Sequence, residues 1–162
     1  MADIWTPEKR SEVMARIRGG NTRPERLTRS LLHRHGYRFT VNGPKNRTLP
    51  GRPDLVLPAR HTVVFVHGCF WHGHEHCRHF RIPDSRRDWW VAKIDGNRAR
   101  DRRVERELLD LGWHVVTLWE CALRTAADRQ WLERQLPRLL GPATGKRTQP
   151  PDHSPGQSSR MS

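Results

Sequence analysis

The chain has 162 residues, about one domain's worth, and its 30 Lys and Arg against 17 Asp and Glu give a net charge of +13. A surplus that large favours a polyanion as partner, although a solubility charge or a membrane-surface protein would also account for it. No stretch approaches about 18 apolar residues, which argues against a membrane-spanning protein. The first residues, MADIWTPEKR, contain no apolar signal core, which argues against a secreted protein. The three cysteines are an odd count, which argues against a disulfide-bonded framework. We therefore expect a monomer in the cytoplasm, associated with the nucleoid.

Two helices and a strand are predicted near the N-terminus. They are a helix over residues 6–18, a helix over residues 22–36 and a strand over residues 37–41, followed by a polar loop over residues 42–47. Thr6 and Thr22 each precede a Pro by one or two positions, which is typical of a helix N-terminus. Gly36 is a suitable stop for the second helix.

A hairpin of buried strands is predicted in the middle of the chain. The elements from there onward are strands over residues 55–57 and 63–66, a long helix over residues 93–111, a strand over residues 113–119 and a last helix capped by Asp128. A run that is apolar on both faces, such as residues 63–66, indicates burial inside a sheet. Val104, Leu108 and Leu111 share one face of the long helix. The order α-α-β-β-β-α-β-α predicts an α/β fold, a mixed β-sheet flanked by helices.

One domain is predicted over residues 1–140, with residues 1–21 forming an N-terminal arm. From residue 141 to residue 162 the sequence is dominated by Pro, Gly, Ser, Thr, Gln and charge, and only Ala143 and Met161 are apolar. Such a segment cannot bury enough surface to order itself. We therefore predict a disordered, basic tail there.

The segment HGCFWHGHEHC concentrates side chains that bind metals. Cys69, His74 and Cys77 have the spacing C-x4-H-x2-C, and Cys121 follows the last predicted strand. Three thiolates and one imidazole make a closed tetrahedral zinc site, so the zinc would be structural. Two alternatives stay open: His76 is the ligand instead of His74, or Cys121 is a buried small hydrophobe and the histidines form only a polar loop.

Asp54 is a candidate ligand for a catalytic cation. It opens the apolar strand in the run LPGRPDLVL. A carboxylate at the mouth of a buried strand is costly unless it is paired or bound to a cation, and in metal-dependent nucleases such an Asp holds Mg²⁺ against the scissile phosphate. The alternative is a loop Asp that makes a turn or pairs with Arg52.

His72 is a candidate general base. If His74 serves zinc, His72 is spare, and a neutral His can activate water near pH 7. Asp101, on the long helix, could orient it, although spacing alone cannot show that the two meet. Glu25 is a possible acid near the metal, and its alternative role is a favourable charge in the first turn of a helix.

Four aromatic residues lie beside basic loops rather than at helical or strand periodicity. They are Phe70, Trp71, Trp89 and Trp90, the last two on a turn predicted to be capped by Ser85. Apolar side chains near a basic groove can enter between base steps and kink a duplex. The alternative is ordinary core packing. We assign the remaining tryptophans to packing: Trp5, Trp113, Trp119 and Trp131.

Five motifs in order carry a resemblance to a known family. They are RSEVMARIR, LPGRPDLVL, VVFVHGCFWHGHEHC, KIDGNRARDRR and LGWHVVTLWECALR. From about residue 6 to residue 140 the chain closely resembles the bacterial very-short-patch mismatch repair endonucleases. The resemblance implies a restriction-endonuclease-like core, a structural zinc, and Mg²⁺-dependent nicking of double-stranded DNA 5′ to the T of a T·G mismatch left by deamination of 5-methylcytosine. It also implies mismatch-repair proteins and a repair polymerase as candidate partners.

The resemblance assigns a role to each candidate residue. The implied roles are Mg²⁺ binding by Asp54 and the backbone carbonyl of Val66; catalysis by His72 with Asp101 supporting it and Glu25 beside them; zinc ligation by Cys69, His74, Cys77 and Cys121; a duplex wedge of Phe70, Trp71 and Trp90; entry from the other groove by Met14; a phosphate contact by His67; and reading of the mismatched pair and its neighbours by Lys93, Asn97 and Arg124.

The sequence also departs from the usual restriction-type pattern. The strand after Asp54 reads Val64-Phe65-Val66, without the Glu-x-Lys of that motif, a peculiarity that the family shares; Val66 stands where a member can carry Thr. Two other functions remain open: a restriction-type endonuclease without mismatch specificity, and a non-catalytic, zinc-stabilised DNA-binding module.

Overall fold

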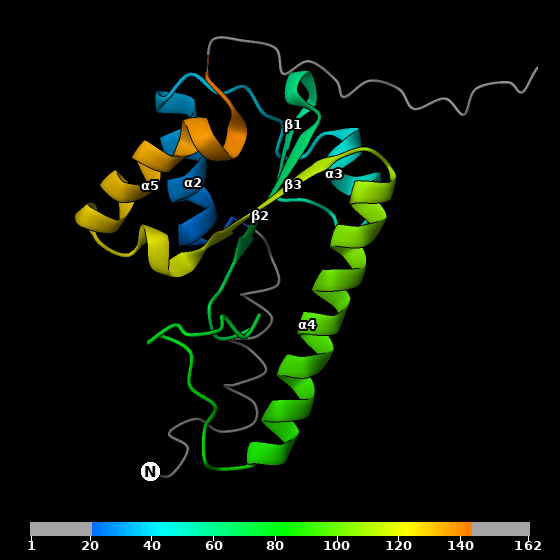
Figure 1. Ribbon diagram of the computed structural model, residues 1–162, viewed down its shortest axis with the longest axis vertical. Coiled ribbons are helices and arrows are strands. Elements are labelled where there is room, and N and C mark those ends of the chain that lie inside the picture. Colours follow the sequence, from blue (N-terminus) through cyan, green and yellow to red (C-terminus); the bar gives the residue numbers. More distant parts are fainter. Residues whose placement is uncertain (1–20, 144–162) are drawn as a thin grey trace, which may run out of the picture.

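The computed structural model describes residues 21–143, and the chain there alternates helices with three strands (Figure 1). Its elements, with η for short 3-10 helices, are α2 (Arg23–Arg34), α3 (Pro44–Thr48), β1 (Leu55–Leu57), η1 (Pro58–Arg60), β2 (Thr62–His67), α4 (Arg87–Asp110), β3 (His114–Trp119), η2 (Glu120–Leu123) and α5 (Ala126–Leu140). The predicted helix over residues 6–18, Trp5, Met14 and the tail from residue 144 onward lie outside the described residues.

The three strands form one mixed sheet in the order β1-β2-β3. β1 and β2 are the predicted hairpin, antiparallel with Leu55 opposite Val64, and η1 makes its turn. β2 and β3 run parallel, with Val63 opposite Val115. β2 is therefore the central strand, which explains why its first four residues are buried on both faces. The mixed α/β class is confirmed.

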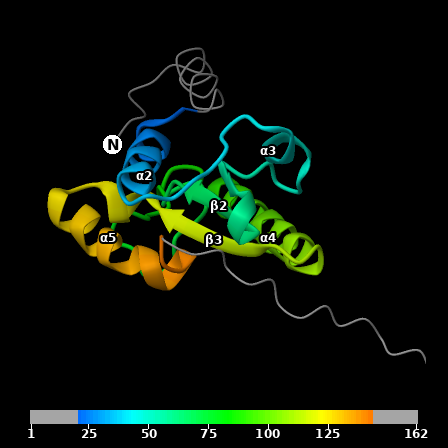
Figure 2. The same ribbon diagram turned by 90° about the horizontal axis from the view of Figure 1, so that it is seen from above.

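Helices cover both faces of this sheet (Figure 2). On one face, alternate strand residues such as Leu55, Leu57 and Val64 pack with leucines of α2 and α5. On the other face, Val56, Val63 and Phe65 pack with Leu108 of α4 and with Trp113. The two sets follow from the alternation of side chains along a strand. Among the described helices, none is long and apolar enough to cross a membrane.

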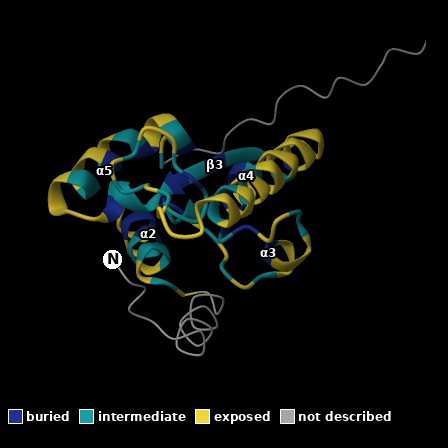
Figure 3. Ribbon diagram, turned by 90° about the horizontal axis from the view of Figure 1, so that it is seen from below, coloured by how far each residue is buried: buried dark blue, intermediate teal, exposed yellow. Residues whose placement is uncertain are grey.

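The long helix α4 begins earlier than the sequence suggested and is mostly exposed (Figure 3). It starts at Arg87 instead of residue 93, so Trp89 and Trp90 lie in its first turn and not on a separate turn capped by Ser85. Trp90 contacts the rings of Phe70 and Trp71 from a distant segment, a tertiary effect that local sequence does not reveal. The predicted apolar face is also too long, because Leu111 is 57% exposed.

Three further local predictions were wrong. Residues 37–41 are not a strand, because Thr40 makes only an isolated bridge to Val56. The predicted polar loop contains α3, which is tied down from within by the buried side chain of Asn46, donating to the carbonyls of Thr40 (3.0 Å) and Pro53 (3.1 Å). α5 is capped by Thr125, and Asp128 is its reciprocal partner in a capping box.

The end of the domain is packed as far as Ala143, inside the segment that we placed in the tail. Ala143 packs against the larger core, and the Tyr37 hydroxyl donates to the Gly141 carbonyl at 2.7 Å. Arg60 lies over the Tyr37 ring and donates to the Leu140 and Pro142 carbonyls. Trp131, assigned to packing, is 53% exposed on α5, so that assignment was wrong.

Candidate active site

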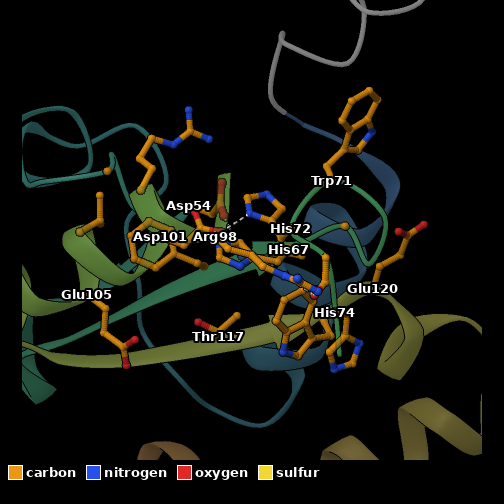
Figure 4. A pocket seen from close by; sticks show the side chains of 18 of the residues that line it. Asp54, His67, Trp71, His72, His74, Arg98, Asp101, Glu105, Thr117 and Glu120 are labelled. Carbon is orange, nitrogen blue, oxygen red and sulfur yellow. Dashed lines mark hydrogen bonds and ion pairs between the residues drawn. The ribbon is translucent and has the colours of Figure 1, made fainter. Parts of the chain in front are cut away.

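A cleft of about 1150 Å³ lies where the C-terminal end of β2, the first turn of α2 and the middle of α4 come together (Figure 4). The residues predicted for catalysis line it together: Glu25, Asp54, His72 and Asp101, with Val66 and His67 beside them. These six positions come from four separate segments of the chain. The fold thus gathers into one cleft a set that sequence spacing could not connect.

Asp54 sits at the start of β1, where a backbone donor from β2 holds it. The Val66 N–H donates to Asp54 Oδ2 at 2.7 Å. Burial raises the pKa of Asp54 to about 6, and the nearby negative charge of Glu25 adds to the rise, whereas the Val66 hydrogen bond and the charge of Arg29 oppose it. The described contacts of Asp54 include no pairing with Arg52. A half-buried carboxylate with a raised pKa suits a divalent cation.

Glu25 contributes a second carboxylate to the cleft from the first turn of α2. It also accepts the Asn21 N–H at 2.8 Å, and its own N–H donates to the Thr22 hydroxyl at 3.4 Å. The local role at a helix N-terminus is therefore present together with the position near Asp54. The two roles are compatible, because Glu25 both accepts the Asn21 N–H and lines the cleft.

His72 and Asp101 meet across the cleft, which the sequence could propose but not demonstrate. His72 Nδ1 and Asp101 Oδ2 are 2.6 Å apart. Burial raises the pKa of Asp101, but the hydrogen bond and charge of His72 outweigh it and hold that pKa below its ordinary value. With Nδ1 engaged, Nε2 is the ring nitrogen left to take a proton from water. This is the arrangement that an oriented general base requires.

His67 stacks flat on His72, and both residues line the cleft. Their ring centroids are 3.7 Å apart and their planes differ by 5°. Burial, together with the charge of His72, lowers the pKa of His67 to about 4. His67 is therefore neutral at pH 7 and can support the His72 ring without placing a second positive charge against it.

Cys69, His74, Cys77 and Cys121 form a compact donor cluster at the side of the cleft. One ligand atom from each lies within 4.8 Å of the others, so the four could hold a metal ion. Burial raises the pKa of Cys69 to about 12 and also raises that of Cys121, so both thiols need a cation to ionise. His74 faces Cys121 at 3.6 Å, whereas His76 is exposed and lies outside the cluster. The geometry favours His74 among the two alternatives.

An aromatic cluster adjoins the cleft through Trp71, which lines it. Phe70 is 5.2 Å, centroid to centroid, from both Trp71 and Trp90, and Trp89 is 4.7 Å from Trp90. Trp89 is 45% exposed, and the other three rings are half-buried. This is not the fully enclosed packing of a core residue such as Trp113.

The residues predicted to read bases are not all directed outward. Lys93 and Arg124 are exposed, and Arg124 pairs with Glu120 at 3.7 Å. Asn97 instead turns inward, where its Nδ2 donates to the Trp71 carbonyl at 2.8 Å. Met14 lies outside the described residues.

Comparison with known proteins gives a consistent result. The family model described as DNA mismatch endonuclease Vsr matches residues 2–79. A type II nicking enzyme of Xanthomonas oryzae is 48% identical over 143 residues, covering 88% of this chain and all of that protein. The DNA mismatch endonuclease Vsr of Escherichia coli is 44% identical over 124 residues, covering 76% of this chain and 77% of that one. The chain belongs to the Vsr family of DNA mismatch endonucleases.

The family confirms the resemblance that the motifs carried, and the cleft shows what the motifs missed. The cleft is also lined by three arginines for which no role was predicted from the sequence: Arg98, Arg100 and Arg102. Arg52, considered only as a partner of Asp54, lines it as well. Arg29, one turn after Glu25 on α2, acts on the charge of Asp54. The four-residue spacing of Glu25 and Arg29 was a usable signal, because such residues share a helix face.

Proposed function

We propose that the chain nicks double-stranded DNA 5′ to the T of a T·G mismatch, by Mg²⁺-dependent hydrolysis of one phosphodiester bond. The observation that carries the proposal is the joint position of Asp54 and the His72–Asp101 pair in one cleft of a mismatch-endonuclease family member. A DNA-binding module would have no need of an oriented His beside a half-buried carboxylate with a raised pKa.

The donor sets fit two different metals. Asp54, with the backbone carbonyl of Val66 and Glu25 nearby, offers the oxygen ligands that Mg²⁺ prefers. When bound, Mg²⁺ would neutralise charge that builds up on the phosphate and its leaving oxygen. Cys69, His74, Cys77 and Cys121 offer the closed set of sulfur and nitrogen donors typical of structural zinc. We propose a restriction-endonuclease-like core braced by that zinc.

The protein residues divide the proton chemistry between them. His72 takes the proton of the attacking water at Nε2, and Asp101 holds the ring and stabilises its charged form. His67, neutral at pH 7, fixes the ring from below and remains available to a phosphate oxygen as a neutral donor. Asp54 needs its ionised form to bind the cation, so binding of Mg²⁺ and loss of the Asp54 proton are linked.

Recognition is proposed to depend on how easily the duplex opens. Phe70, Trp71 and Trp90 form the wedge, and Met14 would enter from the other groove. Wedging costs a few kcal/mol of unstacking per step, and a mismatched step is already weaker. Lys93 and Arg124 have the exposure needed to reach the duplex, and Asn97 would have to leave Trp71 to read a base.

The proposed cellular setting rests on the bacterial relatives and on the proposed DNA substrate. The relatives compared above are bacterial, so we expect a monomeric enzyme in the cytoplasm, at the nucleoid, with mismatch-repair proteins and a repair polymerase as partners. The T·G mismatch itself would arise from deaminated 5-methylcytosine.

Binding and nicking measured on one T·G duplex test the assignment of Asp54. Asp54→Ala should lose nicking while it retains mismatch binding, and exposed Asp110→Ala is the matched control. Retained nicking by Asp54→Ala would remove Asp54 from the metal site. Binding without nicking by the wild-type chain, with Mg²⁺ present, would instead support the non-catalytic module.

A further inference from the structure

Three side chains of α4 hold three consecutive residues of the loop that carries the general base. Asn97 Nδ2 donates to the Trp71 carbonyl at 2.8 Å, Asp101 pairs with the His72 ring at 2.6 Å, and Arg98 Nε donates to the Gly73 carbonyl at 3.0 Å. Arg98 Nη2 donates to the same carbonyl. His72 therefore has its ring oriented from one side and its backbone fixed on both sides, by one helix.

Arg98 has few of the features of a surface arginine. Its side chain is only 24% exposed, and its guanidinium lies 5.3 Å from the ring centroid of Phe80, a later residue of the same loop. Asp95, one turn before it on α4, lies 3.7 Å from Nη1 and steadies the group. Packing on a ring and two bonds to one carbonyl restrict the guanidinium to a single placement.

The approach of Arg98 to the loop needs the glycine that it touches. Gly73 is buried and has a φ of +57°, a left-handed conformation that L side chains rarely adopt. A Cβ there would lie 2.5 Å from Arg98 Nε and 2.5 Å from Ile94 Cγ2. The loop thus lies against α4 with no room for a side chain, which accounts for the Gly inside the Cys/His segment.

The contact between α4 and the loop also connects the aromatic cluster with the catalytic pair. α4 carries both Trp90, a member of the aromatic cluster, and Asp101, the partner of the general base. The loop carries Trp71 of the same cluster and His72 itself. The contacts of α4 with residues 71–73 hold the aromatic cluster and His72 in a fixed relation to each other. A shift of about 1 Å in a catalytic group can cost on the order of 10²-fold in rate.

We infer that Asn97 and Arg98 are positioning residues, which fix the backbone on either side of His72 and so couple the aromatic cluster to the catalytic pair. This inference rests on the proposed function, because it assigns the two residues to the nicking step. It also gives the inward-facing Asn97 a role other than base reading.

The experiment compares Arg98→Ala, Arg98→Lys and Asn97→Ala with the control Arg103→Ala. Arg103 is 68% exposed on the same helix, pairs only with Glu107 among its described contacts, and does not line the cleft, so its loss removes one positive charge without touching the loop. Two quantities are measured on one T·G duplex with Mg²⁺: the single-turnover nicking rate at saturating enzyme, and the Kd. Melting temperature and bound zinc are measured in parallel.

Arg98→Ala and Asn97→Ala should each lower the saturated rate by about 10- to 100-fold. For Arg98→Ala the Kd should stay within about threefold of the Arg103→Ala value. Arg98→Lys should recover part of the rate, because an ammonium can still donate to the Gly73 carbonyl. Equal rates for Arg98→Ala and Arg103→Ala would overturn the inference, as would a loss confined to the Kd. If Arg98→Ala does not fold or hold zinc, Arg98→Lys and Asn97→Ala decide by the same criteria.

The outcome for the wild-type chain separates this inference from the proposed function. Wild-type protein that fails to nick T·G duplexes overturns the proposed function, and the inference with it. Wild-type nicking combined with unaffected Arg98 and Asn97 variants overturns the inference alone.

Discussion

Asp54→Asn should make the metal-free protein more stable at neutral pH while it abolishes nicking. Asp54 is half-buried near Glu25, and its partial burial raises its pKa from 3.8 to about 6. Ionising it in the folded state is therefore harder than in the unfolded chain. The Asn side chain has nearly the same shape, and its carbonyl oxygen can still accept the Val66 N–H.

The size and sign of the effect follow from that pKa. For a carboxyl whose folded pKa is raised, the folded state binds more protons than the unfolded state between the two values, so stability falls as pH rises through them. The penalty is complete above the folded value and amounts to about 3 kcal/mol at pH 7.5. It is roughly half as large at pH 5 and disappears below the unfolded value. Asp54→Asn removes this penalty.

Thermal unfolding of wild type, Asp54→Asn and the exposed control Asp110→Asn, each free of Mg²⁺, gives the measurement. At pH 7.5 Asp54→Asn should melt about 5–10 °C above wild type, with a smaller gap at pH 5. Added Mg²⁺ should stabilise wild type and not Asp54→Asn, because the Asp54 carboxylate is the proposed ligand of the cation. An Asp54→Asn protein no more stable than wild type, or a gap equally large at both pH values, would refute the burial argument.

Three other predictions concern the base, the zinc cluster and the DNA. His72→Ala should lower the single-turnover nicking rate by about 10²- to 10⁴-fold, and a loss under about tenfold would exclude a general-base role. Cys121→Ser, or chelation of zinc, should lower the melting temperature more than Ser30→Ala, a substitution at an exposed position of α2; an unchanged melting temperature would contradict a structural metal. The log of the Kd for the duplex should rise linearly with the log of the salt concentration, because each phosphate contact releases counterions. A Kd that does not change with salt would contradict an interface based on phosphate contacts.

The start of α2 and the β1–β2 hairpin could be predicted because residues close together in the sequence determine them. Thr22 before Pro24 predicted the start of α2, where the Thr22 side chain is the observed cap. The two apolar runs predicted the hairpin of β1 and β2, since only a strand buried on both faces needs such runs. The strand predicted from Tyr37 failed because β-prone residues need a partner, and β1 offers this segment one bridge only.

Residues far apart in the chain decided the rest. Nothing in the sequence could show that His72 lies 2.6 Å from Asp101, or that Asn97 turns toward Trp71, because both contacts depend on how α4 crosses the loop. Motif resemblance supplied the residues of the candidate site, and the fold supplied their contacts. Arg98 was missed because its partner is a backbone carbonyl, which leaves no trace in residue type.

The central claim is that this cleft nicks one strand at a T·G mismatch. The most direct measurement maps the products from duplexes labelled on either strand, identical except for T·G, T·A or C·G at one position, with and without Mg²⁺. We expect one nick, 5′ to the T, in the T·G duplex with Mg²⁺ only. Equal cutting of the matched duplexes, cutting of both strands, or no cutting of the T·G duplex would contradict the account.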